Sequence, residues 1–316
     1  MDMITLHDNE AAFTRYKIRP RILTDVSAVD TSTTIFGQRV AFPFGFAPAA
    51  SHKLAHPDGE AATARAAARV GVCMGLSAYA TTGLEEVAAA AADELGKGGR
   101  EAQNGVQKVQ EGWQGPPLAM QLTMFRDRGV SARILKRAEG EYGRRGEGDA
   151  GYKAVFLTVD CPVLGMRLNE YRNNFAMPDD MTFPNLTENP SEPISLADGD
   201  AKLSYVYTAD DVILAIRHGV DGVIVSNHGG RQLDGVPATL DALRECAAAG
   251  AGRIQIGIDG GIRRGTDIFK ALALGATHCF AGRVPIWGLA HDGQEGVELA
   301  LNILMAEFKM TMGLAG

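Results

Sequence analysis

The sequence predicts an α/β fold of alternating parallel strands and helices, best described as a TIM-type (β/α)8 barrel. Short apolar runs alternate with alanine-rich helical stretches, and most of the runs end in a polar residue. Such alternation indicates a parallel sheet covered by helices. The length of 316 residues suits one barrel domain spanning 1–316. Because barrels carry their active sites at the C-terminal ends of the strands, we expect the site there.

Seven strands follow from the apolar runs, with helices between them. The expected strands are 42–48, 72–77, 118–122, 154–160, 222–225, 254–259 and 278–282. The expected helices are 57–70, a segment opening at 83–87, 130–138, 208–218, 239–248 and 266–274. Gly71, Gly219 and Gly275 follow three of these helices and are typical helix stops.

Two stretches interrupt the alternation. Residues 93–115, rich in Gly, Gln and Lys, predict a surface insertion, and residues 177–199, rich in Pro, Asp, Asn and Ser, predict a long loop. After that loop only 203–207 alternates like a strand. We therefore expect a barrel that is incomplete around its fourth helix and fifth strand. Either 203–207 closes the gap, or a partner covers it, or the chain folds poorly.

Composition excludes several classes of function. The net charge of −7 and the lack of Lys/Arg runs argue against a nucleic-acid or membrane-surface partner. The four cysteines form no CxxC pair, so neither disulfides nor a metal site is expected. No signal peptide or membrane span is apparent, and the end Leu-Ala-Gly is no peroxisomal signal. We expect a soluble, cytoplasmic protein, and a homo-oligomer is compatible with the sequence.

The most informative motif is SNHGGRQLD, residues 226–234, which follows the strand at 222–225. His228 can accept a proton near neutral pH, and Arg231 can bind a carboxylate through two hydrogen bonds. The pair suits a substrate that carries an acidic group and loses a neighbouring proton. The alternative is that His228 is a buried structural histidine.

A second motif predicts a phosphate site. Asp259, Gly260, Gly261 and Arg263 lie between a strand and the next helix, and Gly282-Arg283 repeats the pattern one strand later. Glycines let backbone N–H groups approach an anion, and helix N-termini favour negative charge. Barrels bind phosphate with the loops after strands seven and eight, which is where these segments fall. The alternative is that the glycines only make turns and the arginines only face solvent.

The motifs SNHGGRQLD, DGGIRRGTD, FKALALGA, LTVDCPVLG, APAASHKLAHPDGE and RPRILTDVS together resemble the FMN-dependent α-hydroxy acid oxidases and dehydrogenases, the family of glycolate oxidase and lactate oxidase. The resemblance runs from about Phe13 to the C-terminus. It implies a TIM barrel that holds FMN at its C-terminal face. It also implies oxidation of an (S)-2-hydroxy acid to a 2-oxo acid, with electrons passing to oxygen or another acceptor.

The resemblance assigns roles by position. His228 is the base, Asp160 stabilises it when protonated, and Arg231 and Arg167 face the substrate. The residues assigned to FMN are Ala47, Ala49, Ser77, Gln121, Thr158, Ser226, Asp259, Gly260, Gly261, Arg263, Gly282 and Arg283. Each has a plainer alternative: Asp160 can cap a helix, Arg167 can be solvated, and the hydroxyl side chains can cap turns.

The sequence also departs from the family pattern. An N-terminal tyrosine has no counterpart, a second tyrosine is replaced by Thr123, and a frequent tryptophan is replaced by Tyr79. Ser204 aligns with the lysine that lies beside the flavin, and Lys202 is its neighbour. Three hypotheses follow: an active FMN-dependent oxidoreductase, a non-catalytic FMN- or phosphate-binding remnant, or another phosphate-binding barrel such as an isomerase.

Overall fold

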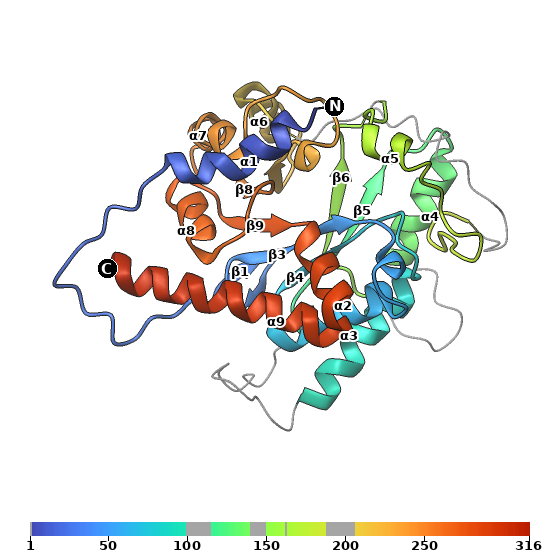
Figure 1. Ribbon diagram of the computed structural model, residues 1–316, viewed down its shortest axis with the longest axis horizontal. Helices are drawn as coiled ribbons and strands as arrows, with labels where there is room; N and C mark the ends of the chain where they lie inside the picture. The colour runs from blue at the N-terminus through green and yellow to red at the C-terminus, as the bar shows by residue number, and fades with distance from the viewer. Residues whose placement is uncertain (1, 99–114, 140–149, 162, 188–205) are drawn as a thin grey trace.

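The computed structural model describes residues 2–98, 115–139, 150–161, 163–187 and 206–316 (Figure 1). Seven parallel strands form one curved sheet in the spatial order β6-β5-β4-β3-β9-β8-β7. They are β3 (Phe44–Ala49), β4 (Cys73–Leu76), β5 (Leu118–Thr123), β6 (Ala154–Thr158), β7 (Gly222–Val225), β8 (Gln255–Ile258) and β9 (His278–Ala281). The first and last of these strands, β3 and β9, pair as they do in a closing barrel.

The helices follow the strands in the predicted order. They are α2 (Gly59–Val70), α3 (Leu84–Gly98), α4 (Arg128–Glu139), α6 (Ala209–Arg217), α7 (Thr239–Gly250) and α8 (Gly265–Ala273). All seven predicted strands and these six helices are confirmed, with boundaries shifted by a few residues. The predicted glycine stops hold as well: Gly71, Gly219 and Gly275 adopt φ values of 84°, 70° and 109°, which few residues other than glycine tolerate.

In the described part of the chain, the barrel is incomplete between β6 and β7, as the sequence predicts. Among the described residues the fifth strand position is represented by Val206, which makes one parallel bridge to Val225 of β7. The other residues of the predicted strand, 203–205, lie outside the described residues. On the edge strand β6, Val155 and Leu157 keep 46% and 39% of their surface exposed. A helix normally covers this face of a barrel strand, and none of the described helices covers this pair at the position of the fourth helix.

The two interrupting stretches are only partly as predicted. The expected insertion at 93–115 is wrong at its start, because helix α3 continues to Gly98, and 99–114 lie outside the described residues. The alanine run before it explains the extension, since alanine favours helix. Residues 177–187 contain turns without a helix or strand, as a loop should, and 188–199 lie outside the described residues.

Further elements lack a clear signal in the sequence. They are α1 (Ile4–Arg15), the hairpin β1 (Thr33–Ile35) and β2 (Gln38–Val40), two short 3-10 turns, η1 (His52–Leu54) and η3 (His228–Gly230), α5 (Leu168–Arg172) and α9 (Arg283–Ala315). Helix α1 has a weak apolar face, and α9 is interrupted by non-helical residues at Asp292 and Gly293. Both therefore lack the continuous 3.6-residue periodicity that identifies a helix.

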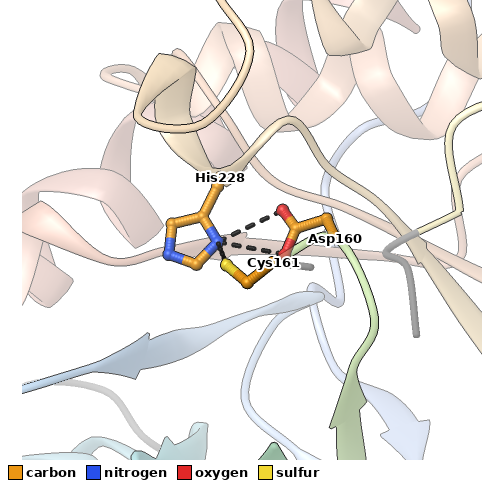
Figure 2. Close-up of side chains that lie close together, drawn as sticks. All are labelled: Asp160, Cys161 and His228. Atoms are coloured by element: carbon orange, nitrogen blue, oxygen red, sulfur yellow. Dashed lines mark hydrogen bonds and ion pairs between the residues drawn. The ribbon is translucent and has the colours of Figure 1, made fainter. Parts of the chain in front are cut away.

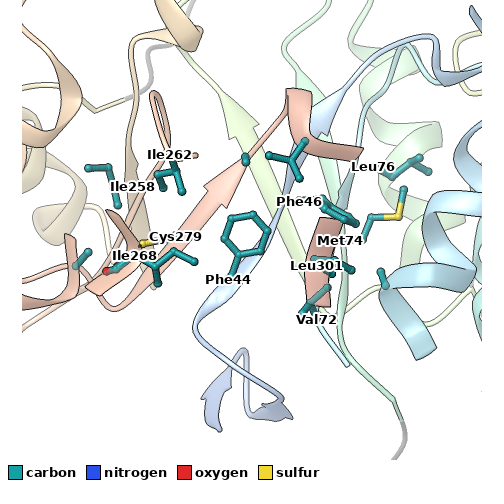
Figure 3. Packing of buried hydrophobic residues seen from close by; sticks show 14 of the residues in the cluster. Phe44, Phe46, Val72, Met74, Leu76, Ile258, Ile262, Ile268, Cys279 and Leu301 are labelled. Atoms are coloured by element: carbon teal, nitrogen blue, oxygen red, sulfur yellow. Dashed lines mark hydrogen bonds between the residues drawn. The ribbon is translucent and has the colours of Figure 1, made fainter. Parts of the chain in front are cut away.

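Two apolar layers hold the sheet. Outside it, Phe44, Phe46, Met74 and Ile258 pack in the layer that also contains Leu301 of α9 (Figure 3). Inside the barrel, small and large side chains interleave: Ala47, Cys73, Ala119, Phe156 and Phe280, with Ile35 and Val40 of the hairpin. The filled interior leaves the C-terminal strand ends as the place for a site. Among the described helices, none has the length and apolar character needed to cross a bilayer.

Candidate active site

The loops after β6 and β7 bring a base and a carboxylate together. His228 Nδ1 lies 3.2 Å from both carboxylate oxygens of Asp160, and 3.7 Å from the Sγ atom of Cys161. Figure 2 shows the second ring nitrogen, Nε2, pointing away from both partners. A carboxylate at Nδ1 stabilises the protonated ring and fixes its orientation. Burial and the nearby Asp160 raise the pKa of Cys161 to about 12, so its sulfur is a neutral thiol.

The backbone at His228 is unusual. His228, Gly229 and Gly230 all adopt left-handed conformations, with φ values of 56°, 61° and 71°. A side chain larger than glycine rarely adopts this conformation, and it costs of order 1 kcal/mol. Strain of this kind persists only where the surroundings hold the loop, so the contacts that hold it become part of the site.

Helix α1 supplies those contacts. The amides of Asn9 and Asn227 are buried and exchange two hydrogen bonds of 2.9 and 2.8 Å. A Cβ added at Gly230 would lie 2.7 Å from the backbone N of Leu6. Only glycine permits this approach of α1. Sequence analysis missed Asn9, because nothing near it in the sequence indicates that α1 packs on a loop more than 200 residues away.

Gln232 joins the two loops that carry the base and its carboxylate. Its Oε1 accepts a hydrogen bond from Gly165 N at 3.1 Å. Its Nε2 donates to the backbone oxygens of Asp160 and Val163 at 3.3 and 3.0 Å. This residue lies in the predicted motif, but the motif gave no reason to assign it a role. The geometry indicates that Gln232 sets the position of Asp160 relative to His228.

The two predicted substrate arginines lie close together. Arg231 Nη2 and Arg167 Nη1 approach the same atom, Glu170 Oε1 in α5, at 3.2 and 3.4 Å. Desolvation and the neighbouring Arg167 lower the pKa of Arg231. Two guanidinium groups that converge on one carboxylate are suited to a carboxylate ligand. Glu170 was also missed, since an acidic residue three positions after an arginine is common on helices.

The hydroxyl and amide side chains predicted for the flavin edge form one buried row across β4, β5 and β6. Gln121 Nε2 donates to Thr158 Oγ1 at 2.8 Å and to Thr123 Oγ1 at 3.0 Å. Gln121 Oε1 accepts from Ala78 N at 2.9 Å and from Ser77 Oγ at 3.4 Å. The predicted residues Ser77, Gln121 and Thr158 are therefore brought together. Thr123, where the family pattern has tyrosine, turns its hydroxyl to Gln121.

At the predicted phosphate end, the two arginines have different surroundings. Arg263 Nη2 lies 2.6 Å from Glu10 Oε1, and its guanidinium lies 4.8 Å from the centre of the Trp287 ring. Arg283 Nη2 donates to Gly229 O at 2.8 Å, which joins this end of the site to the His228 loop. The arginines thus converge on one region, with the acidic Glu10 beside it.

The glycines of this end differ in what surrounds them. A Cβ on Gly261 would lie 2.1 Å from Asn9 O of α1, and one on Gly260 would lie 2.8 Å from Thr239 Oγ1. At Gly260 and Gly261, the space that a side chain would fill is therefore occupied by a neighbouring segment of the protein. A Cβ on Gly282 would meet nothing within 4 Å. The space beside Gly282, at the start of α9, is the position where an anion can approach the backbone.

Asp259 provides the clearest sign of a missing ligand. Its Oδ1 is buried and has no hydrogen-bond partner among the described residues. Burial raises the pKa of Asp259 to about 6, and a hydrogen bond with Ser226 offsets only part of that effect. A buried unpaired acceptor calls for a donor such as a hydroxyl group. Ser226 Oγ in turn accepts from His228 N at 3.1 Å. In β3, Ala47 is buried and Ala49 is partly exposed.

These residues fit FMN: an unpaired acceptor for a ribityl hydroxyl, arginines for a phosphate and a polar row for the ring edge. The fold is an α/β barrel whose C-terminal strand ends carry a histidine–carboxylate pair and two arginines that contact one carboxylate. The residue at the family's lysine position, Ser204, and the neighbouring Lys202 lie outside the described residues.

Comparison with known proteins identifies the family. A model of the FMN-dependent dehydrogenase family matches residues 1–204 and 198–316. The chain belongs to this family, and it is an FMN-dependent enzyme. The two matched segments overlap at 198–204, in the region where the sequence predicts an incomplete fourth helix and fifth strand.

Curated relatives agree over the whole chain. The oxidase FUB9 of Fusarium oxysporum f. sp. lycopersici is 44% identical over 342 residues, covering 100% of this chain and 81% of the relative. Glycolate oxidase of Spinacia oleracea is 41% identical over 345 residues, and 2-hydroxyacid oxidase 1 of Mus musculus is 40% identical over 347, each covering 100% of this chain and 85% of the relative.

Solved structures confirm the fold. The crystal structure of mandelate oxidase with benzoyl-formic acid matches with a TM-score of 0.82 at 37% identity, covering 100% of this chain and 87% of that one. Mandelate oxidase with (S)-2-phenylpropionate matches with the same TM-score at 35% identity, covering 100% and 86%.

Proposed function

We propose that this chain oxidises an (S)-2-hydroxy acid to the corresponding 2-oxo acid, with His228 as the base. The single observation that carries the proposal is the anchoring of His228 Nδ1 by both oxygens of Asp160 at 3.2 Å. That contact leaves Nε2 as the proton acceptor. The named relatives, a glycolate oxidase and a 2-hydroxyacid oxidase, support this substrate class.

Each side chain of the site has a separate role in the proposed reaction. Arg231 and Arg167 bind the substrate carboxylate and thereby place C2 and its hydroxyl beside His228. His228 takes the proton that leaves the substrate, and Asp160 stabilises the imidazolium that results. FMN, when bound, supplies the two-electron acceptor. Glu170 must give up its contacts with the two arginines when the substrate carboxylate enters, since it is the internal carboxylate at this position.

The cofactor would be held along the rest of the site. Asp259 would accept from a ribityl hydroxyl, Arg263 and Arg283 would bind the phosphate with Gly282, and the Ser77–Gln121–Thr158 row would face the polar ring edge. Ala47 and Ala49 would lie along the ring. Gly260 and Gly261 would shape the loop through their left-handed backbone, with φ of 92° and 81°, and Ser226 would hold Asp259.

Two finer points belong to the same proposal. We infer that oxygen reoxidises the enzyme, because the named relatives are oxidases. We also infer that the substrate can be larger than glycolate, because Thr123 occupies the place of a tyrosine and leaves more room. Mandelate, with its phenyl group, is the natural compound with which to test this.

The test is anaerobic mixing of the purified, FMN-loaded protein with glycolate, lactate, and (S)- and (R)-mandelate, while the flavin spectrum is recorded. The proposal predicts stoichiometric bleaching by at least one (S)-acid and none by the (R)-acid. The alternative, a non-catalytic FMN-binding remnant, rests on the incomplete barrel between β6 and β7. It predicts a yellow protein whose spectrum no hydroxy acid changes.

A further inference from the structure

The proposed base belongs to a group of three different side chains that can each bind a metal ion. Asp160 and Cys161 follow β6, His228 follows β7, and the side chains converge (Figure 2). Their ligand atoms all lie within 4.8 Å of one another. Cys161 has no part in the proposed reaction, so its presence here is otherwise unexplained.

The spacing of these atoms matches a tetrahedral zinc ion. Zinc binds sulfur at about 2.3 Å and nitrogen or oxygen at about 2.0–2.2 Å, so ligand atoms around it lie roughly 3.3–3.8 Å apart. The Sγ of Cys161 lies 3.7 Å from His228 Nδ1, and the Asp160 oxygens lie 3.2 Å from it. The three ligand atoms, all within 4.8 Å of one another, therefore lie close to the separations that one shared ion requires.

We propose that Asp160, Cys161 and His228 form an inhibitory site for Zn²⁺ or a similar borderline metal ion. This inference rests on the proposed function, since it concerns control of the same base. Cys161 would lose its thiol proton to solvent and bind as thiolate, and His228 would bind through the lone pair of Nδ1. Three protein ligands leave a fourth coordination position open to water.

Metal binding at this site would switch the base off. A neutral imidazole carries one N–H, and a metal on Nδ1 forces that proton onto Nε2. The nitrogen that faces the substrate then has no lone pair with which to accept a proton. Asp160 would also be withdrawn from its role of stabilising the imidazolium. The inhibited state would retain FMN, because none of the three ligands belongs to the proposed phosphate seat.

The sequence could not reveal this site by spacing. Cys161 and His228 are 67 residues apart, and zinc motifs are recognised by ligands two to five residues apart. The expectation of no metal site came from the absence of a CxxC pair. The fold places the ligands together because the loops that follow the edge strands β6 and β7 contact each other.

The experiment is a titration of the FMN-loaded protein with Co²⁺ as a spectroscopic substitute for Zn²⁺. We expect one equivalent to give the intense d–d bands of tetrahedral cobalt, which lie at longer wavelength than oxidised flavin absorbs. Cys161→Ser should abolish these bands. Cys246→Ser, which removes a buried cysteine of α7, is the matched control and should leave them unchanged. Absence of the bands, or their persistence in Cys161→Ser, would overturn the proposal.

A second measurement keeps the site separate from the proposed reaction. Zn²⁺ should slow anaerobic flavin reduction in the parent protein, and its inhibition constant should rise more than about tenfold in Cys161→Ser, with the metal-free rate unchanged. Equal inhibition of both proteins would reject the site. If no hydroxy acid reduces the flavin, the proposed function fails, while the cobalt spectrum still decides whether the metal site exists.

Discussion

The two ends of the candidate site are built on different parts of the barrel. The proposed phosphate end follows β8 and β9, which are hydrogen-bonded on both sides within the sheet. The base and its carboxylate follow β7 and β6, the two edge strands that border the gap. Sheet pairing on both sides therefore supports the first end, where α1 also packs against Gly261, whereas loop contacts through Gln232 and Asn9 position the second. We therefore expect that substitutions can disturb cofactor binding and catalysis separately in this chain.

The largest difference between the effect on flavin reduction and the effect on FMN binding is expected from His228→Ala. Removal of the base should slow flavin reduction by roughly 10²–10⁴-fold, the usual contribution of general base catalysis. The content of bound FMN should be unchanged, since the phosphate end does not depend on the imidazole. Rapid mixing under anaerobic conditions measures the rate, and the spectrum of the purified protein measures FMN. His218→Ala, an exposed histidine at the end of α6, is the control. Unchanged reduction in His228→Ala would contradict the assignment of the base.

Asp259→Asn tests the proposed phosphate end of the site. Burial raises the pKa of Asp259 from 3.8 to about 6, so the folded state favours the protonated carboxyl. The charged form therefore opposes folding above about pH 6, and this penalty disappears as pH falls below 4. The substitution should stabilise the FMN-free protein by on the order of 2 kcal/mol at pH 8 and progressively less toward pH 4.

Urea unfolding of the FMN-free protein at several pH values measures this effect, with the exposed Asp221→Asn as the control. The same Asp259→Asn variant should bind FMN more weakly, because a neutral amide oxygen accepts from a hydroxyl less strongly than a carboxylate and the other carboxylate oxygen becomes a donor. A gain in stability that is the same at every pH, or unchanged FMN affinity, would contradict the role given to Asp259.

A smaller effect is expected at the junction of the two loops. Gln232→Ala removes three hydrogen bonds between the β6 and β7 loops. Flavin reduction should slow roughly tenfold, which corresponds to about 1.4 kcal/mol in the barrier, while FMN affinity stays the same. Gln232→Glu keeps the acceptor and loses the donor. Its rate of flavin reduction should lie between those of the parent protein and Gln232→Ala. If Gln232→Ala lowers FMN affinity as much as the rate, the two ends are not independent.

The smallest effect is expected from the acidic side chains that contact the arginines. Glu170→Gln should lower KM for the hydroxy acid about two- to fivefold at constant kcat, since exposed ion pairs contribute roughly 0.2–1 kcal/mol. Glu10→Gln, at the phosphate end, should leave KM unchanged and increase FMN affinity by a similar factor. Steady-state kinetics and FMN titration separate the two outcomes. A rise in KM in Glu170→Gln would show that Glu170 supports Arg231 instead of competing with substrate.

The elements that could be predicted from the sequence are the strand–helix units that repeat along the barrel. Each barrel unit carries a short apolar strand and a periodic helix, so the order of elements and the gap at the fifth strand could be read from local pattern. The proximity of His228 to Asp160 followed from the resemblance together with the rule that strand ends meet at one face. The roles of Asn9, Gln232 and Glu170 could not be read, because each depends on contacts between segments that only the tertiary structure brings together.

The most direct test of the central claim compares an α-protiated with an α-deuterated 2-hydroxy acid in the anaerobic reduction of the bound flavin. We expect stoichiometric bleaching that is slower with deuterium in the parent protein, since the bond at C2 breaks as the flavin is reduced. We also expect loss of that bleaching in His228→Ala with FMN retained. A parent protein that holds FMN but shows no bleaching with any hydroxy acid would contradict the account.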